Sequence, residues 1–259
     1  MTIELTYPEE AHGMIPRTVA ILQSFRGTHG ELGVSDIHRR TGLPKATVHR
    51  TLHELQKVGI LERAGSRFRP GLLLFELGQL QSTAQLLRSV AVPYVENLSR
   101  RSCATAAIAM LDGIECVYLH VASSPGCHRS PRRTGGRWPA HASCSGKVLL
   151  ASLAHPESVL PTALPRLTSR TTTSPAALIR ELEQIRSRGI AYDNEESAPG
   201  LSGMATPILG LCGEVVGAIS ISRPTTNGWA PSDPSMVRQA AAAISQALRK
   251  AELRRTRMR

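Results

Sequence analysis

The chain has 259 residues, of which 41% are hydrophobic and 20% are charged. This composition is typical of a folded globular protein, and it excludes both an intrinsically disordered chain and a membrane-embedded one. The length favours two structural units of unequal size. The formal net charge of +11 at pH 7 favours a polyanionic partner.

The N-terminal segment carries Glu4, Glu9 and Glu10 where an export signal would be basic, and no stretch approaches the ~18 uncharged apolar residues of a spanning helix. We therefore expect a cytoplasmic protein that does not contact membranes. The five cysteines are odd in number and include no C-x-x-C pair, so reduced thiols are expected. His141 and Cys144 have a spacing that metal ligands can have, but no second pair follows at zinc-site spacing. We predict neither a metal nor a cofactor.

A helix-turn-helix is predicted within residues 34–58. In the segment Gly42-Leu43-Pro44, the glycine can end one helix in a left-handed conformation and the proline presets the backbone for the next. A short helix is expected before this turn, over Val34–Thr41, with Asp36 favouring its N-terminus. A supporting helix further upstream is predicted by an apolar stripe that consists of Ile15, Val19, Ile21, Leu22 and Phe25.

The helix after the turn is expected to read DNA. Its inward stripe is predicted to be Val48, Leu52, Leu55 and Val58. After Gly59, two short runs at residues 60–63 and 67–69 flank Ala64-Gly65-Ser66, as the strands of a hairpin would. A helix that fits the major groove beside a basic hairpin forms a winged helix-turn-helix.

Basic residues concentrate in this segment, because residues 34–70 hold eight basic and three acidic side chains. The alternative is a small helical domain with a solvated basic face, but the turn chemistry, the inward stripe and the hairpin agree on a DNA-binding unit. The basic tail at residues 249–259 is expected to be a solvated helix end. The predicted DNA contacts are Arg39, Arg40, Lys45, Ala46, Thr47, His49, Arg50, Arg67 and Arg69.

Residues 41–50 resemble the IclR family of bacterial transcriptional regulators, whose pattern there is close to T-G-L-P-K-S-T-V-x-R. They read Thr41-Gly42-Leu43-Pro44-Lys45-Ala46-Thr47-Val48-His49-Arg50. The resemblance continues in the family's order through residues 68–80, 138–151, 188–200 and 205–222. Two departures occur: His38 stands where the family keeps a small alanine, and Ala46 replaces a serine, which removes one possible phosphate contact.

The second unit is predicted to follow a linker helix at residues 73–90. Runs at 104–111, 115–121, 204–209 and 214–222 predict strands, and runs at 145–153, 174–188 and from about 232 predict helices. Antiparallel strands covered by helices indicate an α+β fold. The resemblance implies a GAF-like effector-binding and oligomerisation domain at residues 91–256, after a winged helix-turn-helix domain at residues 12–72.

The resemblance also implies a pocket for a small molecule between the sheet and its covering loops. Backbone N–H groups near Ser145 can hold a carboxylate, so an organic acid is the expected effector. Gly203 stands where relatives that bind small keto acids carry a cysteine, which implies a wider pocket and a larger acid, such as an aromatic one. The implied effector residues are Cys127, Ser130, Cys144, Ser145, Asp193, Gly203, Ser220 and Ser222. A solvated, mobile loop is expected for Arg129, Arg132, Arg133 and Arg137.

We therefore expect a transcription regulator, a repressor in preference to an activator, that binds a palindromic operator as a homodimer or tetramer and is controlled by a small metabolite. A hydrolase-like enzyme with a DNA-binding appendage is the alternative. It would use Ser145 or Cys144 as nucleophile, His141 as base, and Asp193 or Glu195 to orient the base. We predict no catalytic residues, because the G-x-S-x-G, S-x-x-K and G-K-[ST] patterns are missing. A third reading, a general DNA-coating protein, would bind any duplex equally.

Overall fold

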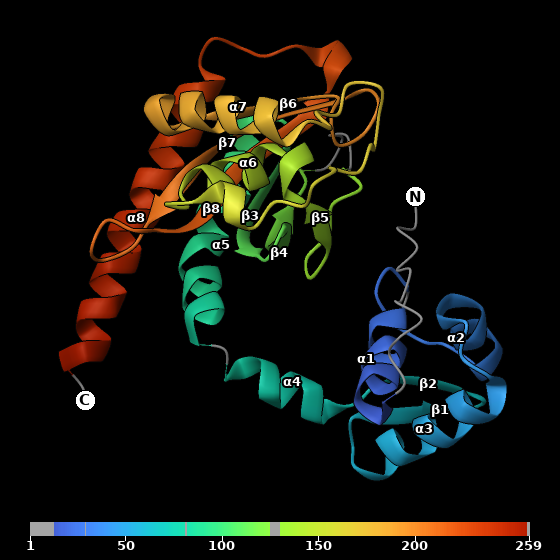
Figure 1. Cartoon of the computed structure of the whole chain (residues 1–259). Helices are drawn as coiled ribbons and strands as arrows, with labels where there is room; N and C mark the ends of the chain where they lie inside the picture. The colour runs from blue at the N-terminus through green and yellow to red at the C-terminus, as the bar shows by residue number, and fades with distance from the viewer. Residues whose placement is uncertain (1–12, 29, 81, 125–129, 258–259) are drawn as a thin grey trace. The chain divides into compact units, whose positions relative to one another are not determined.

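The computed structural model describes residues 13–28, 30–80, 82–124 and 130–257. The chain divides into two compact units, the first ending at Ser82 and the second beginning at Thr83. The first is a small helical unit with a two-stranded hairpin, and the second contains a larger sheet covered by helices (Figure 1). Among the described helices, none is long and apolar enough to cross a membrane.

The first unit is a winged helix-turn-helix. Its elements are α1 (Met14–Ser24), α2 (Val34–Thr41), α3 (Lys45–Lys57), β1 (Leu61–Ala64), β2 (Arg67–Pro70) and α4 (Leu72–Gln79). The two wing strands are antiparallel with Ala64 opposite Arg67, so the hairpin turns through Gly65 and Ser66 alone. Its core consists of Ile21, Phe25, Leu32, Ile37, Val48, Leu52, Leu55, Leu61 and Phe68.

The predicted turn between α2 and α3 is confirmed. Gly42 has a φ of +71°, which glycine adopts without strain, and its N–H donates to the carbonyl oxygen of His38 at 2.8 Å. The side chain of His38 spans the turn, because its Nδ1 lies 2.8 Å from the carbonyl oxygen of Leu43. At the start of α2, the Asp36 carboxylate accepts a hydrogen bond from the Gly33 N–H at 3.2 Å. The angle between α2 and α3 is therefore fixed by local bonds at both ends of α2.

Three positions of the predicted inward stripes are wrong. Ile15 and Val19 on α1 are 74% and 38% exposed. The buried face of α1 consists of Ala20, Ile21 and Ser24 instead. Val58 is 59% exposed, because α3 ends at Lys57 and Val58 no longer follows the helical spacing.

Two helices stand where we predicted one linker helix over residues 73–90. α4 ends at Gln79, and α5 (Ser82–Ser102) continues well beyond the predicted end. The prediction stopped early because Pro93, inside α5, removes a backbone donor and disfavours a helix interior. Tertiary packing offsets this cost through a buried stripe of Leu87, Ala91, Val95 and Leu98.

The second unit has three layers, with helices on both faces of a six-stranded antiparallel sheet (Figure 1). Its strands are β3 (Thr105–Asp112), β4 (Glu115–Ala122), β5 (Arg137–Pro139), β6 (Ala191–Asn194), β7 (Leu201–Leu209) and β8 (Val215–Pro224), in the order β5-β4-β3-β8-β7-β6. α5 and α8 (Asp233–Arg257) cover one face. α6 (Cys144–Ala151) and α7 (Pro175–Arg188) cover the other. The predicted α+β fold is confirmed, whereas β5 and β6 were missed because such short edge strands carry little alternation.

The sheet face beneath α6 is made largely of small side chains, which include Ala107, Ala191, Ala205 and Ala218. Every residue of α6 is buried. At Gly146, a Cβ would lie only 2.3 Å from the Cα of Ala140. The start of α6, where the effector site was predicted, therefore lies deep inside the second unit.

A first prediction concerns Gly71, which determines how closely α4 follows the wing. A Cβ at this buried residue would lie 2.3 Å from the carbonyl oxygen of Gly59, so the backbone would have to shift. We expect Gly71→Ala to destabilise the protein by about 1–3 kcal/mol. Gly78 on the same helix has open space around it, so Gly78→Ala is a matched control that should stabilise by up to about 1 kcal/mol. Thermal unfolding followed by circular dichroism checks both variants, and an unchanged Tm for Gly71→Ala would contradict the steric argument.

Candidate functional site

The exposed face of α3 is the candidate DNA-binding surface of the first unit. Lys45, Ala46, His49 and Arg50 are exposed and Thr47 is half-buried, above a stripe that is buried in the core. Within the described ranges, the side chains of Lys45 and Arg50 have neither a hydrogen-bond partner nor an ion-pair partner. These two cations are therefore available to phosphates or base edges.

Two histidines lie one turn apart on α3. The Nε2 atoms of His49 and His53 are 3.2 Å apart. The ring of His53 also packs edge-on against Phe68 of the wing, with 5.7 Å between the ring centroids. His53 therefore connects α3 to the wing, whereas His49 remains exposed on α3.

Asp36 connects α2 to the wing. Its carboxylate lies 3.0 Å from Arg39 and 3.2 Å from Arg67, and Arg67 also donates to the carbonyl oxygen of Glu31 at 3.1 Å. The hydrogen bond from the Gly33 N–H lowers the pKa of Asp36, and the two arginines lower it further. Asp36 is thus ionised at neutral pH and forms ion pairs with both Arg39 and Arg67.

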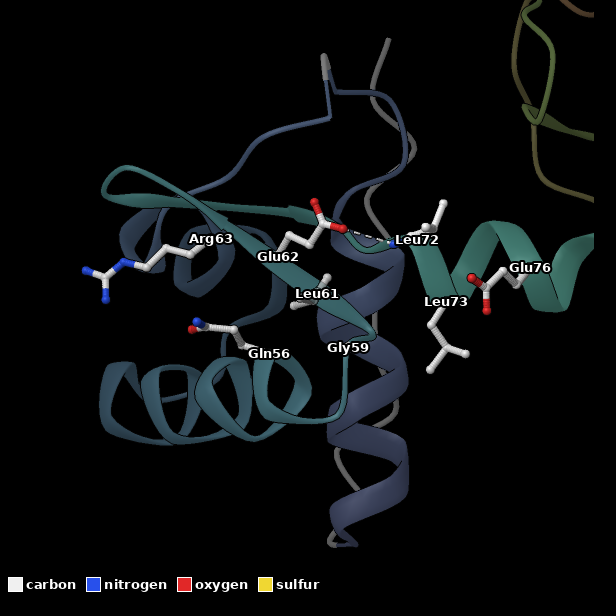
Figure 2. A pocket seen from close by; sticks show the side chains of 8 residues that line it. All are labelled: Gln56, Gly59, Leu61, Glu62, Arg63, Leu72, Leu73 and Glu76. Atoms are coloured by element: carbon white, nitrogen blue, oxygen red, sulfur yellow. Dashed lines mark hydrogen bonds between the residues drawn. The ribbon is translucent and has the colours of Figure 1, made fainter.

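A groove lies where the wing meets α4 (Figure 2). Glu62 binds both sides of this junction, because its Oε1 accepts from the Leu72 N–H at 3.2 Å and its Oε2 lies 3.0 Å from Arg69. Glu76 adds a second carboxylate, so the groove is a poor place for a phosphate. The groove is lined by Gln56, Gly59, Leu61, Glu62, Arg63, Leu72, Leu73 and Glu76.

The structure therefore separates the predicted DNA contacts into two groups. Arg40 donates to the carbonyl oxygens of Ser24 and Arg26 near the end of α1. Arg39, Arg67 and Arg69 are likewise paired within the unit, so these four arginines also brace it. The unpaired cations of the predicted set, Lys45 and Arg50, both lie on α3.

In the second unit, the sheet aligns several of the predicted effector residues in one buried row. Asp193 on β6 lies opposite Gly203 on β7, which lies opposite Ser222 on β8, and Ser220 follows on the same face. Cys144 at the start of α6 covers this row, because a Cβ at Gly203 would lie 2.9 Å from its Sγ. The Cys144 thiol therefore lies against the backbone at Gly203, and the wider pocket expected there stays a prediction.

Arg132 is buried, contrary to the solvated loop that we predicted. Its side chain is 3% exposed, and its Nη2 donates to Asp193 Oδ2 at 3.1 Å and to Ser197 Oγ at 2.9 Å. The guanidinium lies 5.9 Å from the ring centroid of Tyr118 and 5.6 Å from that of Trp138, within cation–π range. Burial alone would lower the pKa of Arg132, but the groups around it, Asp193 among them, raise it on balance. The interior of the second unit thus contains a permanent positive charge.

The other loop residues have different surroundings. Arg133 is exposed, as predicted, and Arg137 is half-buried and pairs with Asp112 and Glu115 of the β3–β4 hairpin. The Oγ of Ser130 accepts from the Arg132 N–H at 3.3 Å, so this predicted effector residue holds the loop at Arg132. The predicted residues Cys127 and Arg129 lie outside the described residues.

Several buried polar atoms in this region lack a hydrogen-bond partner among the described residues. Around Arg132 and the start of α6 they are Arg132 Nε, Trp138 Nε1, Ser145 Oγ and Tyr118 Oη, the last of which belongs to a side chain that interacts with Arg132, and in the Lys147 network the carboxylate atom Glu196 Oε2 is a further one. The two nitrogens can only donate, whereas the hydroxyls can donate or accept. Buried polar groups in folded proteins are nearly always paired. This donor-rich set is therefore suited to a bound molecule that carries acceptors.

A second buried charge network adjoins the first. The Nζ of Lys147 on α6 lies 2.6 Å from Glu181 on α7 and 2.7 Å from Glu196 after β6. Burial alone would lower the pKa of Lys147, but the two carboxylates raise it. The Glu196 N–H also donates to Asp193 Oδ1 at 2.9 Å. Asp193 thus contacts both Arg132 and the backbone of Glu196, which pairs with Lys147.

The hydrolase alternative requires a nucleophile, a base and a carboxylate that orients the base, but the residues named for these roles do not contact one another in that order. Burial raises the pKa of Cys144 to about 12, so the group is a thiol at neutral pH and not a nucleophilic thiolate. The His141 Nε2 lies 2.9 Å from the carbonyl oxygen of Pro165, and Asp193 pairs with Arg132 instead of orienting His141.

Sequence reasoning missed Tyr118, Trp138 and Ser197, and it placed Arg132 in solvent. Tyr118 and Trp138 are two of only nine aromatic residues of the Phe, Trp and Tyr types, which is the one signal that could have marked them. Arg132 has basic neighbours on the same loop, and its local sequence does not distinguish it from Arg133. Only the tertiary fold separates the buried arginine from the exposed one.

Comparison with known proteins identifies both units. Residues 15–65 match the family profile described as the IclR helix-turn-helix domain, and residues 80–246 match that described as the bacterial transcriptional regulator IclR C-terminal. The chain is 32% identical to the glycerol operon regulatory protein of Streptomyces griseus, over 90% of this chain and 95% of that protein. It is 34% identical to the transcriptional repressor AllR of Escherichia coli strain K12, over 90% and 89% respectively.

A solved structure is also similar along nearly the whole chain. It is an IclR homologue from Microbacterium hydrocarbonoxydans in complex with 4-hydroxybenzoate, 34% identical with a TM-score of 0.81, and the match covers 92% of this chain and 100% of that one. Members of this family are transcriptional regulators and not enzymes, with a DNA-binding N-terminal domain and a C-terminal domain that binds small-molecule effectors. The chain therefore belongs to the IclR family of bacterial transcriptional regulators.

Proposed function

We propose that this regulator is a repressor that binds a palindromic operator through α3, assembles as a homodimer or tetramer, acts in the cytoplasm and responds to an organic or aromatic acid. The observation that carries this proposal is the exposed face of α3, where Lys45 and Arg50, which have no partner among the described residues, lie above a buried apolar stripe. Relatives that are named as repressors, such as AllR, support the direction of control.

The DNA contact is proposed to involve the major groove and the flanking phosphates. A guanidinium such as that of Arg50 can bind a guanine edge in a bidentate way, and Lys45 at the start of the helix can bind a phosphate. Thr47 and His49 lie between them on the same helix. The paired arginines Arg39, Arg40, Arg67 and Arg69 would support backbone contacts while they hold α2 and the wing in place.

Self-association is proposed to cover apolar side chains that a single chain leaves in solvent. On α4, Leu72, Phe75, Leu77 and Leu80 are between 52% and 76% exposed. On α1, Met14, Ile15 and Val19 are also exposed. Apolar groups of this number on one small unit are typical of an interaction surface, and a two-fold dimer would present two recognition helices to a palindrome.

The effector is proposed to bind beneath α6, against the row of Asp193, Gly203 and Ser222. The buried donors of Arg132 and Trp138 suit a molecule that carries carboxylate oxygens. The structural relative in complex with 4-hydroxybenzoate supports an aromatic acid. An effector that binds one arrangement of the dimer more tightly would shift the population between DNA-competent and incompetent forms.

A second prediction tests the recognition helix. Because Arg50 is exposed and unpaired, Arg50→Ala should weaken operator binding by about 10- to 100-fold without lowering the Tm. Lys57→Ala is the matched control, since it removes one charge from the other end of the same helix, where Lys57 pairs with Glu54. Fluorescence anisotropy with operator DNA at fixed salt measures both. If Arg50→Ala and Lys57→Ala bound the operator equally well, α3 would not be the reading element.

A third prediction tests the apolar face of α4. Phe75 is 63% exposed, so Phe75→Glu should leave the unit folded but place a charge in the proposed contact between copies. Analytical ultracentrifugation should then show a shift towards the monomer, with weaker operator binding, whereas Gln79→Glu on the same helix should change neither. An unchanged mass distribution for Phe75→Glu would show that α4 does not contribute to the contact between copies.

A further inference from the structure

The effector site contains one feature that the sequence did not reveal, a buried arginine that is already paired with a carboxylate. We propose that Arg132 is the residue that selects carboxylates in this site, and that Asp193 is a built-in counter-ion with which the effector carboxylate competes. This inference rests on the proposed effector function and specifies the chemistry of its binding step.

Arg132 has unused donor capacity although it is buried. Its Nη2 donates to Asp193 and Ser197, while its Nε has no partner among the described residues. Its Nη1 lies 3.5 Å from Ser130 Oγ, at the limit of a hydrogen bond. A guanidinium offers five N–H donors, so a purely structural pairing with Asp193 leaves a large part of this group unsatisfied. An acceptor from outside the chain would satisfy it.

The surroundings of Arg132 favour a planar anion. Trp138 Nε1 is a second donor that has no partner among the described residues and cannot accept, and the Tyr118 side chain lies beside Arg132. The rings of Tyr118 and Trp138 both lie against the guanidinium, and their apolar surface suits an aromatic or other flat ligand. A cationic ligand would meet the charge of Arg132 and leave both nitrogen donors unpaired. The site therefore discriminates between ligands by charge as well as by shape.

Asp193 is expected to oppose a carboxylate effector. The pair of Arg132 and Asp193 is neutral, so a second carboxylate would bring an unbalanced negative charge into the interior. Lys147, which is also buried, does not relieve this, because it already pairs with two carboxylates, those of Glu181 and Glu196. Asp193 also accepts from the N–H groups of Glu196 and Ser197 and so stays in place. Removing its charge should make Arg132 more available to the effector.

The test uses the full-length protein and pairs of probes that differ only in charge, namely benzoate with benzamide and 4-hydroxybenzoate with 4-hydroxybenzamide. Isothermal titration calorimetry measures the Kd of each probe. We expect the parent protein to prefer the carboxylates, and Asp193→Asn to bind them at least about tenfold tighter with little change for the amides. Arg132→Gln should lose the preference for carboxylates.

Two surface variants serve as matched controls. Asp112→Asn removes a carboxylate from the surface ion pair with Arg137, and Arg133→Gln removes the exposed neighbour of Arg132. Both should bind the probes like the parent protein. Circular dichroism confirms that each variant is folded, and if Arg132→Gln does not fold, Asp193→Asn alone carries the test.

A structural role would not produce tighter carboxylate binding in Asp193→Asn. Unchanged or weaker carboxylate binding by that folded variant would overturn the inference, as would equal binding of acids and amides by the parent protein. The absence of binding by any probe to the parent protein and to Asp193→Asn would also overturn it. The proposed regulatory function is judged separately, by the operator binding of the parent protein and Arg50→Ala.

Discussion

The second unit is organised around charges that are buried together. The ion pair between Arg132 and Asp193 connects the loop before β5 to β6, and the ion pairs of Lys147 connect α6 to α7 and to the segment after β6. Breaking one partner of a buried pair costs about 3–5 kcal/mol, because the remaining charge is left uncompensated. A charged molecule placed beside Arg132 would therefore act on both partners of this ion pair.

The first unit distributes its basic residues differently. Asp36 and Glu62 hold Arg39, Arg67 and Arg69 at the edges of the unit, so much of the local charge stabilises the arrangement of α2 and the wing. Lys45 and Arg50 remain on the exposed face of α3, with no internal partner in the described ranges. The paired arginines thus lie beside the exposed cations of α3, and both groups contribute positive charge that favours a phosphate backbone.

The sequence predicted the elements that local chemistry controls. Gly42 requires a left-handed turn, and the spacing of Val48, Leu52 and Leu55 defines the buried side of α3. It predicted poorly where tertiary contacts decide, as at Pro93, which packing retains inside a helix. Arg132 is the clearest case: its burial depends on Asp193, which is distant in sequence, and no local pattern reveals such a partner.

We propose that this chain recognises particular DNA sequences and that a ligand changes this recognition. Selection of fragmented genomic DNA by the purified full-length protein, followed by sequencing of the bound fragments, tests the sequence-specific recognition. We predict enrichment of a few sites that share palindromic half-sites, with affinities at least about 10³-fold above those for random duplexes at physiological salt. Uniform recovery of fragments, with no shared sequence and equal affinity for any duplex, would show that the protein does not recognise a specific operator.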